Sequence, residues 1–164
     1  MSDKANVLQM YHININCSDF ERSLAFYQLL GFRQIVDFNQ LPSGPAPSFG
    51  ELGLGPVLGL PNNCAGRAAL LALGDDPRAT RLDLIEWKQP RSPRKMFEDL
   101  VYLGIARVCL KVRDCQALYE ILLAHGCKMY SPPTLIELAG THEIVFCCED
   151  PDGTVIEFMQ FLRS

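Results

Sequence analysis

The sequence lacks a long hydrophobic run, a basic cluster and a paired cysteine motif, and each absence excludes a class of protein. No apolar stretch approaches the roughly 20 residues that cross a bilayer, so no membrane partner is expected. The net charge of −4, with no basic cluster, disfavours nucleic acid as a partner. The seven cysteines form no Cys-x-x-Cys pair, which argues against a zinc ribbon or a disulfide framework. The first residues hold no signal-peptide stretch, so we expect a reduced cytoplasmic protein.

What the chain does contain is an alternating segment that occurs twice. Residues 11–17 alternate apolar and polar side chains, which predicts a strand with two unlike faces. His12 and Asn14 share the polar face, which must line water, a ligand or a cavity because unpaired polar groups are costly to bury. Residues 106–112 repeat the alternation, and Arg107 lies 95 residues after His12. The pattern indicates a protein built twice around a polar-lined hollow.

A helix follows each of these strands. Ser18 to Glu21 has the Ser-x-x-Glu form of a capping box, which predicts a helix that a glycine ends at Gly31. The distance from Asp19 to Gly31 recurs from Asp114 to Gly126, again at an offset of 95 residues. A repeat of this kind indicates duplication of one supersecondary unit.

Three further strands are expected after each helix. In the first half we expect them at residues 32–38, 67–73 and 80–88, and in the second half at 127–131, 141–148 and 154–161. The first module then spans 8–90, a linker with a short helix spans 91–103, and the second module spans 104–164.

The segment 41–64 interrupts the first module. It holds five prolines and five glycines among scattered apolar residues, a density that excludes a central strand or a long helix. The segment is therefore an irregular insertion, and it either forms a lid over the hollow or covers an edge of the sheet.

Four polar residues occupy the first or last strand of each half. We expect His12, Glu86, Arg107 and Glu157 on the face turned away from the helices, with Glu157 as the counterpart of Glu86. An imidazole and two carboxylates in one hollow suit a divalent metal whose remaining positions hold water.

These residues lie in motifs that resemble the vicinal oxygen chelate superfamily, which includes glyoxalase I, methylmalonyl-CoA epimerase, extradiol dioxygenases and the fosfomycin and bleomycin resistance proteins. The similarity covers residues 8–161 apart from the insertion. Its motifs are His12 before Asp19, Arg22-Ser23-Leu24-Ala25-Phe26-Tyr27, Leu30-Gly31-Phe32, Leu84-Ile85-Glu86-Trp87, and Asp150-Pro151-Asp152-Gly153-Thr154-Val155-Ile156-Glu157.

The resemblance implies an α+β fold of two tandem βαβββ modules whose sheets form an open curled sheet around a central cavity. It also implies His12, Glu86 and Glu157 as metal ligands. The fourth family position, commonly His or Gln, is Arg107 here, and arginine offers only donors. Either three residues hold the metal while Arg107 binds an anionic group, or Arg107 replaces the metal beside the two carboxylates.

The function implied by this resemblance is a metal-dependent lyase or isomerase, similar to lactoylglutathione lyase or an epimerase. It would act on a small carbonyl substrate through an enediolate, with Glu157 or Glu86 moving the proton. The metal would be Ni, Co, Mn, Fe or Zn, and the protein a homodimer. The competing hypothesis is a metal-free protein that binds an aromatic or antibiotic-like ligand. The candidate substrate-binding residues are Arg107, Asn14, His142 and Trp87.

Overall fold

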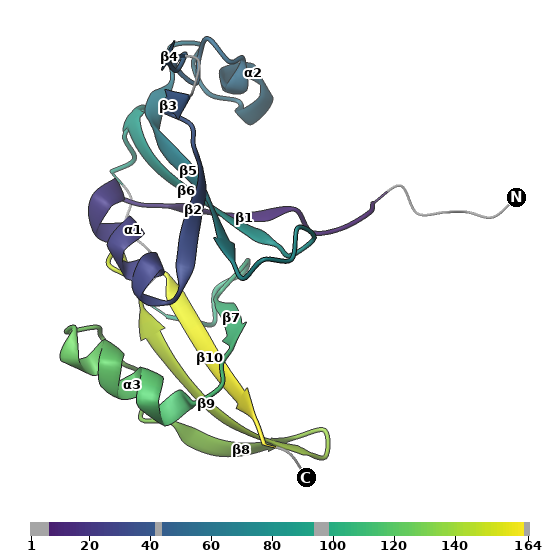
Figure 1. Ribbon diagram of the computed structural model, residues 1–164. Helices are drawn as coiled ribbons and strands as arrows, with labels where there is room; N and C mark the ends of the chain where they lie inside the picture. Colours follow the sequence, from purple (N-terminus) through teal and green to yellow (C-terminus); the bar gives the residue numbers. More distant parts are fainter. Residues whose placement is uncertain (1–6, 42–43, 94–98, 163–164) are drawn as a thin grey trace, which may run out of the picture. The chain divides into compact units, whose positions relative to one another are not determined.

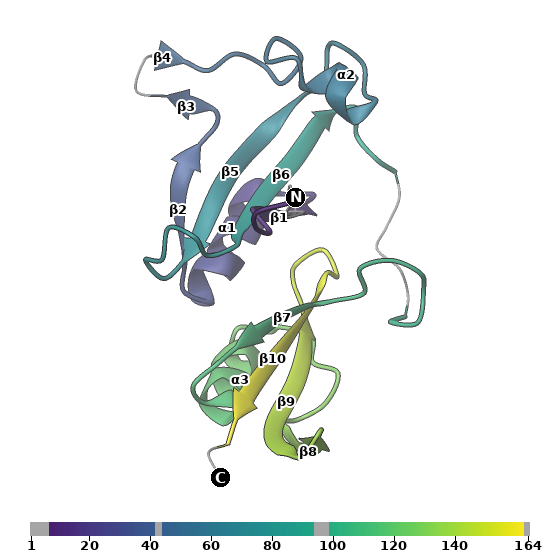
Figure 2. The ribbon, with the colours of Figure 1, turned by 90° about the vertical axis from the view of Figure 1, so that its right-hand side faces the viewer.

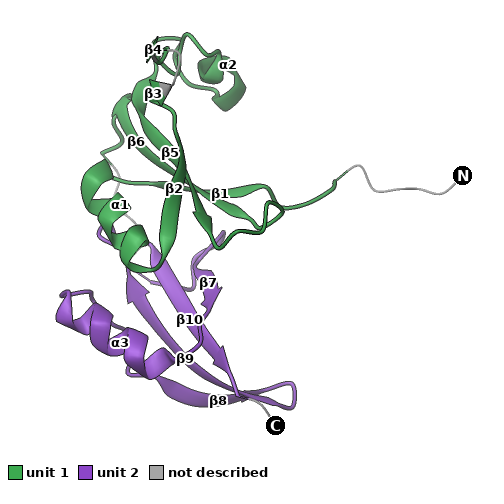
Figure 3. Cartoon of the chain, viewed as in Figure 1, with its two compact units in different colours: residues 1–93 green, residues 94–164 purple. Residues whose placement is uncertain are grey.

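The computed structural model describes residues 7–41, 44–93 and 99–162 of the chain. The chain divides into two compact units, residues 1–93 and 94–164, which are coloured separately in Figure 3. Each unit has its own four-stranded mixed sheet and its own long helix. The structure thereby confirms the predicted α+β fold of two βαβββ modules.

The sheet of unit 1 is formed by β1 (His12–Asn16), β2 (Phe32–Asp37), β5 (Ala65–Leu73) and β6 (Arg81–Gln89). The strands lie in the order β1, β6, β5, β2 (Figure 2). β1 and β6 run parallel, with His12 opposite Arg81, and the other neighbours run antiparallel. The first and last strands of the module are therefore adjacent, which brings residues far apart in the sequence to one place.

The helix α1 (Phe20–Leu29) covers one face of this sheet (Figure 1). Its inward side chains Phe20 and Tyr27 are fully buried, as are Leu71 of β5 and Leu84 of β6. Burial of a side chain of this size contributes about 1.5–3 kcal/mol. This face is the core of unit 1, so the opposite face is the one available to polar side chains.

The N-terminal cap of α1 differs from the predicted capping box. Asp19, and not Ser18, is the capping residue, and its carboxylate accepts from the backbone N–H of Arg22. In unit 2 Asp114 caps α3 (Cys115–Ala124) in the same way, by accepting from the N–H of Ala117. The repeat of 95 residues therefore includes the cap itself.

Unit 2 has the same strand order. Its sheet is formed by β7 (Val108–Lys111), β8 (Thr134–Leu138), β9 (Thr141–Glu149) and β10 (Val155–Phe161), in the order β7, β10, β9, β8. β7 and β10 are the parallel pair. Leu122 of α3 packs in a core with Phe146 and Phe158, whose rings stack at 4.8 Å between centroids.

One prediction about local structure is wrong, and another lies partly outside the described residues. The strand expected at 127–131 is reduced to a single bridge between Met129 and Cys148, and β8 begins only after Pro132-Pro133. Proline lacks the N–H that a ladder needs, which moves the strand past the pair. The predicted linker helix lies partly at 94–98, outside the described residues, and the described remainder at 99–102 is not helical.

The insertion in unit 1 contains only short elements. These are β3 (Gln40–Leu41), β4 (Gly44–Pro45) and the five-residue helix α2 (Leu54–Leu58). Both views show α2 near one end of β5 and β6 (Figures 1 and 2). No helix among the described residues is long and apolar enough to cross a membrane.

Candidate functional site

The polar face of unit 1 carries a histidine–carboxylate pair. His12 Nε2 lies 3.9 Å from Oδ2 of Asp83, and the two side chains are 42% and 16% exposed. Asn14, two residues after His12 on β1, donates from Nδ2 to the backbone carbonyl of Asp83 at 3.1 Å. The parallel pairing of β1 with β6, in which Asn14 is opposite Asp83, sets this arrangement.

Burial controls the electrostatics of this pair. It raises the pKa of the Asp83 carboxyl, while the charge of His12 and the hydrogen bond from Asn14 oppose the rise. Asp83 is thus a carboxylate in a partly desolvated setting, next to an imidazole that stays within reach of solvent. Groups of this kind gather at functional sites, although ion pairs of structural origin also perturb pKa values.

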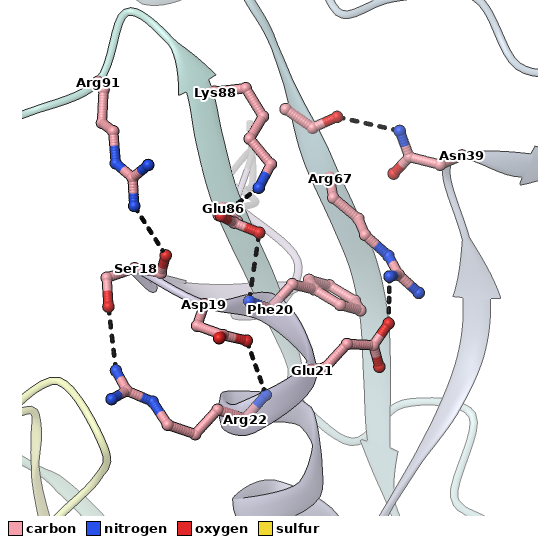
Figure 4. Close-up of polar contacts among 11 residues, drawn as sticks. Ser18, Asp19, Phe20, Glu21, Arg22, Asn39, Arg67, Glu86, Lys88 and Arg91 are labelled. Atoms are coloured by element: carbon pink, nitrogen blue, oxygen red, sulfur yellow. Dashed lines mark hydrogen bonds and ion pairs between the residues drawn. The ribbon is translucent and has the colours of Figure 1, made fainter.

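The structure places Glu86 on the other face of the sheet, so the expectation that it turns away from the helices is wrong. Figure 4 shows Oε2 of Glu86 accepting from the backbone N–H of Phe20, the first residue of α1, at 3.3 Å. Its Oε1 pairs with Nζ of Lys88, and the residue is only 6% exposed. Strand alternation explains this: Glu86 shares its face with the buried Leu82 and Leu84, whereas Asp83 belongs to the opposite face.

Unit 2 has an equivalent of the contact between Glu86 and the start of α1. There Oε1 of Gln160, on β10, accepts from the N–H of Cys115, the first residue of α3, at 2.8 Å. A shift of 74 residues carries Glu86 to Gln160 and Asp83 to Glu157. The counterpart of Glu157 in unit 1 is therefore Asp83, and Glu86 and Gln160 both tie the start of a helix to the last strand.

Backbone hydrogen bonds give the same alignment. The N–H of Cys17 donates to the carbonyl of Ile85 at 2.8 Å, and the N–H of Val112 donates to the carbonyl of Met159 at 2.9 Å. These four residues are related by the shift of 95 residues in the first strand and 74 in the last. The smaller second shift reflects the insertion in unit 1.

The equivalent place in unit 2 holds an ion pair. Nε of Arg107 lies 3.1 Å from Oε2 of Glu157, whose side chain is 15% exposed. The hydrogen bond to Glu157 raises the pKa of Arg107, so the guanidinium stays charged at every physiological pH. Arg107 occupies the position of His12, and Glu157 the position of Asp83.

Two thiols flank Glu157 across the sheet. Glu157 pairs with Cys109 on β7 and with Cys147 on β9, so the three side chains form one row. Burial, and then the charge of Glu157, raise the pKa of Cys109 to about 11, and burial raises that of Cys147. Both are therefore thiols rather than thiolates near neutral pH.

The remaining candidates are placed as follows. Nε2 of His142 lies 3.9 Å from Oε2 of Glu137 on β8, and strand alternation turns it to the face opposite Glu157. His142, a candidate for substrate binding, therefore does not share the face of Glu157 in unit 2. Trp87 lies on the same face as Asp83, and its indole N–H donates to Oδ1 of Asn16 at 2.9 Å.

The donors of each unit differ in how well they suit a metal. Among the described residues of either unit, no three His, Cys, Asp or Glu side chains are grouped as ligands. The His12–Asp83 pair fits as two ligands, because ligand bonds of about 2.0–2.2 Å can bridge a gap of 3.9 Å. Arg107 does not fit, since it has no lone pair to give and already holds Glu157.

The sequence contained a signal for Asp83 that the strand pattern alone did not resolve. Asp83 and Glu86 are three residues apart, so they must lie on opposite faces of one strand. Leu82 and Leu84 mark the face of Glu86 as the apolar one, and the polar residues of β1 must pair with the other. Choosing the carboxylate by face would have selected Asp83.

Comparison with known proteins agrees with this architecture. The family model described as the Glyoxalase/Bleomycin resistance protein/Dioxygenase superfamily matches residues 9–158. No curated protein sequence matches the chain.

Solved structures share the fold at low sequence identity. A glyoxalase family protein from Bacillus cereus is 16% identical with a TM-score of 0.78, and the alignment covers 99% of both chains. A trypanothione-dependent glyoxalase I from Leishmania major is 19% identical with a TM-score of 0.59, over 94% of this chain and 87% of that one. A glyoxylase/bleomycin resistance protein/dioxygenase domain from Frankia sp. is 15% identical with a TM-score of 0.63, over 97% and 96%. The chain therefore belongs to the Glyoxalase/Bleomycin resistance protein/Dioxygenase superfamily.

Proposed function

We propose that the protein is a metal-dependent lyase or isomerase that acts on a small carbonyl substrate. The observation that carries the proposal is the His12–Asp83 pair, an imidazole and a partly desolvated carboxylate on the polar face of unit 1. Nitrogen and oxygen donors of this kind suit the borderline divalent metals Ni, Co, Mn, Fe and Zn. His12 and Asp83 would hold the ion, and a bound metal would supply Lewis-acid polarisation of a carbonyl oxygen.

Unit 2 carries a second candidate group, for which we propose anion binding and proton transfer. The guanidinium of Arg107 carries a permanent charge and several donors, and its side chain is 46% exposed, so it can bind a carboxylate or phosphate. Glu157, held in place by Arg107, would serve as a general acid or base. We give Glu86 no part in this chemistry, because its carboxylate accepts from the first N–H of α1.

The proposal extends to the setting of the protein. None of the seven cysteines, all of them described residues, forms a disulfide, and we propose a reduced cytoplasmic compartment. A homodimer is proposed as the working assembly. Among the described residues of the first strand, Asn14 remains a candidate for substrate binding, because its side chain is exposed beside Asp83.

A comparison of Asp83→Asn with Glu86→Gln tests the proposal. Metal content is measured on protein purified without chelator or nickel resin, and the affinity for Co²⁺ by calorimetry. We expect a bound divalent metal that Asp83→Asn and His12→Ala lose and that Glu86→Gln retains. An empty protein that takes up no added metal would contradict the proposal and favour a metal-free binding protein.

A further inference from the structure

Residues 44–64 of the insertion, which we call the platform, pack against the sheet of unit 1. Phe49 is 3% exposed and packs with Cys64 and Ala68. The N–H of Gly50 donates to the carbonyl of Cys64 at 2.9 Å. A Cβ at Gly50 would lie 1.8 Å from the carbonyl oxygen of Asn62, so residues 50 and 62 of the insertion approach as closely as only glycine permits.

The platform is seated on the face of the sheet that carries Asp83. The ring of Phe49 meets that of Trp87 edge to face, with centroids 5.4 Å apart. Ile85 packs against the same cluster. A Cβ at Gly66 would lie 2.8 Å from Phe49, so the sheet leaves the ring just enough room.

Trp87 has a second anchor on the first strand. Its indole N–H donates to Oδ1 of Asn16 at 2.9 Å, and Asn16 follows His12 and Asn14 along one face of β1. The indole is therefore held from two sides, by Phe49 of the insertion and by Asn16 of β1. Two independent contacts thus hold the indole beside Asn16, the last of the three polar residues on this face of β1.

The spacing along β6 relates this ring to the polar pair. Asp83, Ile85 and Trp87 alternate onto one face, and a strand rises about 3.3 Å per residue. Ile85 thus lies roughly 6.6 Å from Asp83, and Trp87 roughly 13 Å. Both side chains are half-buried, so each retains surface that a ligand can contact. A molecule held at His12 and Asp83 that extends along β6 meets apolar surface first and an aromatic wall next.

We infer that Trp87, positioned by Phe49 and Asn16, selects substrates that carry an aromatic or bulky apolar group roughly 13 Å along β6 from the reactive oxygens. The inference rests on the proposed function for the polar end of the substrate. It assigns the insertion a specificity-determining role: Phe49 and Asn16 position the indole, and the indole contacts the substrate. A small molecule without the apolar group fills only the polar end.

Two 2-oxo acids with the same head test this inference. The probes are 2-oxobutanoate and 8-phenyl-2-oxooctanoate, whose chain is long enough to carry the ring past Ile85 toward Trp87; they are titrated by calorimetry and by the fluorescence of Trp87, the single tryptophan of the chain. We expect the phenyl compound to bind about tenfold or more tightly, as burial of a ring against apolar surface predicts. We also expect it, and not 2-oxobutanoate, to change the tryptophan emission.

Three variants separate positioning from packing. Phe49→Leu keeps apolar volume but removes the ring, and Asn16→Ala removes the anchor at an exposed position. Both should reduce the preference for the phenyl probe to less than about threefold, whereas Leu58→Ala, which is 52% exposed in the same insertion, should leave it unchanged. A preference close to unity in the wild type, failure of the phenyl probe to bind, or variants that lower only the Tm would overturn the inference.

The same titrations distinguish this inference from the proposed function. His12→Ala and Asp83→Asn should weaken both probes by the same factor, which preserves the preference. The phenyl probe could bind with a change in tryptophan emission that neither variant affects. That result would support the role of Trp87 and contradict the proposed role of His12 and Asp83. Both variants could instead lower the affinity for 2-oxobutanoate while the phenyl group adds no affinity. That result would support the proposed function and contradict the role of Trp87.

Discussion

The two units share one strand order but carry different side chains at their matched polar positions. Both have the strand order first, last, third, second, and both tie the helix start to the last strand, through Glu86 in unit 1 and Gln160 in unit 2. At the matched polar positions, however, unit 1 has the His12–Asp83 pair and unit 2 the Arg107–Glu157 ion pair. The positions that hold the start of a helix therefore make the same contact in both units, whereas the matched polar positions carry different side chains.

The divergence extends to the neighbours of each carboxylate. Asp83 lies between Asn14 and Leu70, whereas Glu157 lies between Cys109 and Cys147. Unit 1 therefore has a titratable His12–Asp83 pair next to an apolar neighbour. Unit 2 has the permanent cation of Arg107 and two thiols beside Glu157. This difference predicts unequal responses of the two units to the same treatment.

The largest expected effect is the low reactivity of Cys109, which has no thiol counterpart in unit 1. A pKa of about 11 instead of 9.0 lowers the thiolate fraction at pH 8 about 100-fold. Alkylation by iodoacetamide, followed by peptide mass spectrometry, should be about 100-fold slower than in the unfolded protein. Glu157→Gln should restore part of the rate. Fast alkylation of Cys109 in the native protein would show that its contact with Glu157 is absent.

Removal of either side chain that holds the start of a helix, Glu86 or Gln160, should lower the unfolding free energy by a similar amount. Glu86→Ala and Gln160→Ala each leave a helix N–H without its acceptor, which costs about 1–3 kcal/mol. Glu86→Gln converts the tether of unit 1 into that of unit 2 and should change the unfolding free energy little. Urea unfolding measures all three. A neutral Glu86→Ala would contradict the equivalence of Glu86 and Gln160.

Arg107→His should make unit 2 resemble unit 1. An imidazole beside Glu157 offers a lone pair where the guanidinium offers only donors, so the affinity for Co²⁺ should rise by about tenfold or more. Calorimetry on the variant and the wild type provides the measurement, with Arg33→His, at an exposed ion pair of β2, as the control. An unchanged affinity would mean that Arg107 is not the counterpart of His12.

The smallest effect is the pH dependence of Asp83. Burial raises its folded-state pKa above the unfolded value, so the folded protein binds this proton more tightly. The contribution of Asp83 to stability therefore falls as the pH rises through that range. Asp83→Asn should raise the stability at pH 7 by less than about 1 kcal/mol, with no gain below pH 3.8. A destabilised variant at pH 7 would contradict the expected direction.

Local pattern predicted most of the fold because the duplication repeats it. The helix after Asp19 and the helix after Asp114 follow from capping, apolar spacing and a glycine stop. The strand at 134–138 was missed because its five residues are all exposed, so no apolar alternation marks it. The local pattern could not predict the strand register, because the register depends on pairing between strands that are distant in the sequence.

The candidate site shows the same limit. The sequence identified His12, Arg107 and Glu157, because an offset of 95 residues relates the first two and the last strand ends the chain. It selected Glu86 over Asp83 because a carboxylate near a strand end resembles Glu157, and the insertion changes the spacing of the last strand. Leu82 and Leu84 mark the apolar face of β6 in the sequence, and the pairing of β1 with β6 shows directly that Asp83 shares the face of His12.

Paramagnetic broadening by Co²⁺ in the ¹⁵N-labelled protein tests the central claim most directly, namely that Asp83 and not Glu86 is the functional carboxylate of unit 1. Substoichiometric Co²⁺ should broaden the amide signals of His12, Asn14 and Asp83 first and spare that of Phe20, whose N–H Glu86 holds on the other face of the sheet. Asp83→Asn should abolish the effect. Broadening that begins at Phe20, or that survives in Asp83→Asn and disappears in Glu86→Gln, would contradict the account.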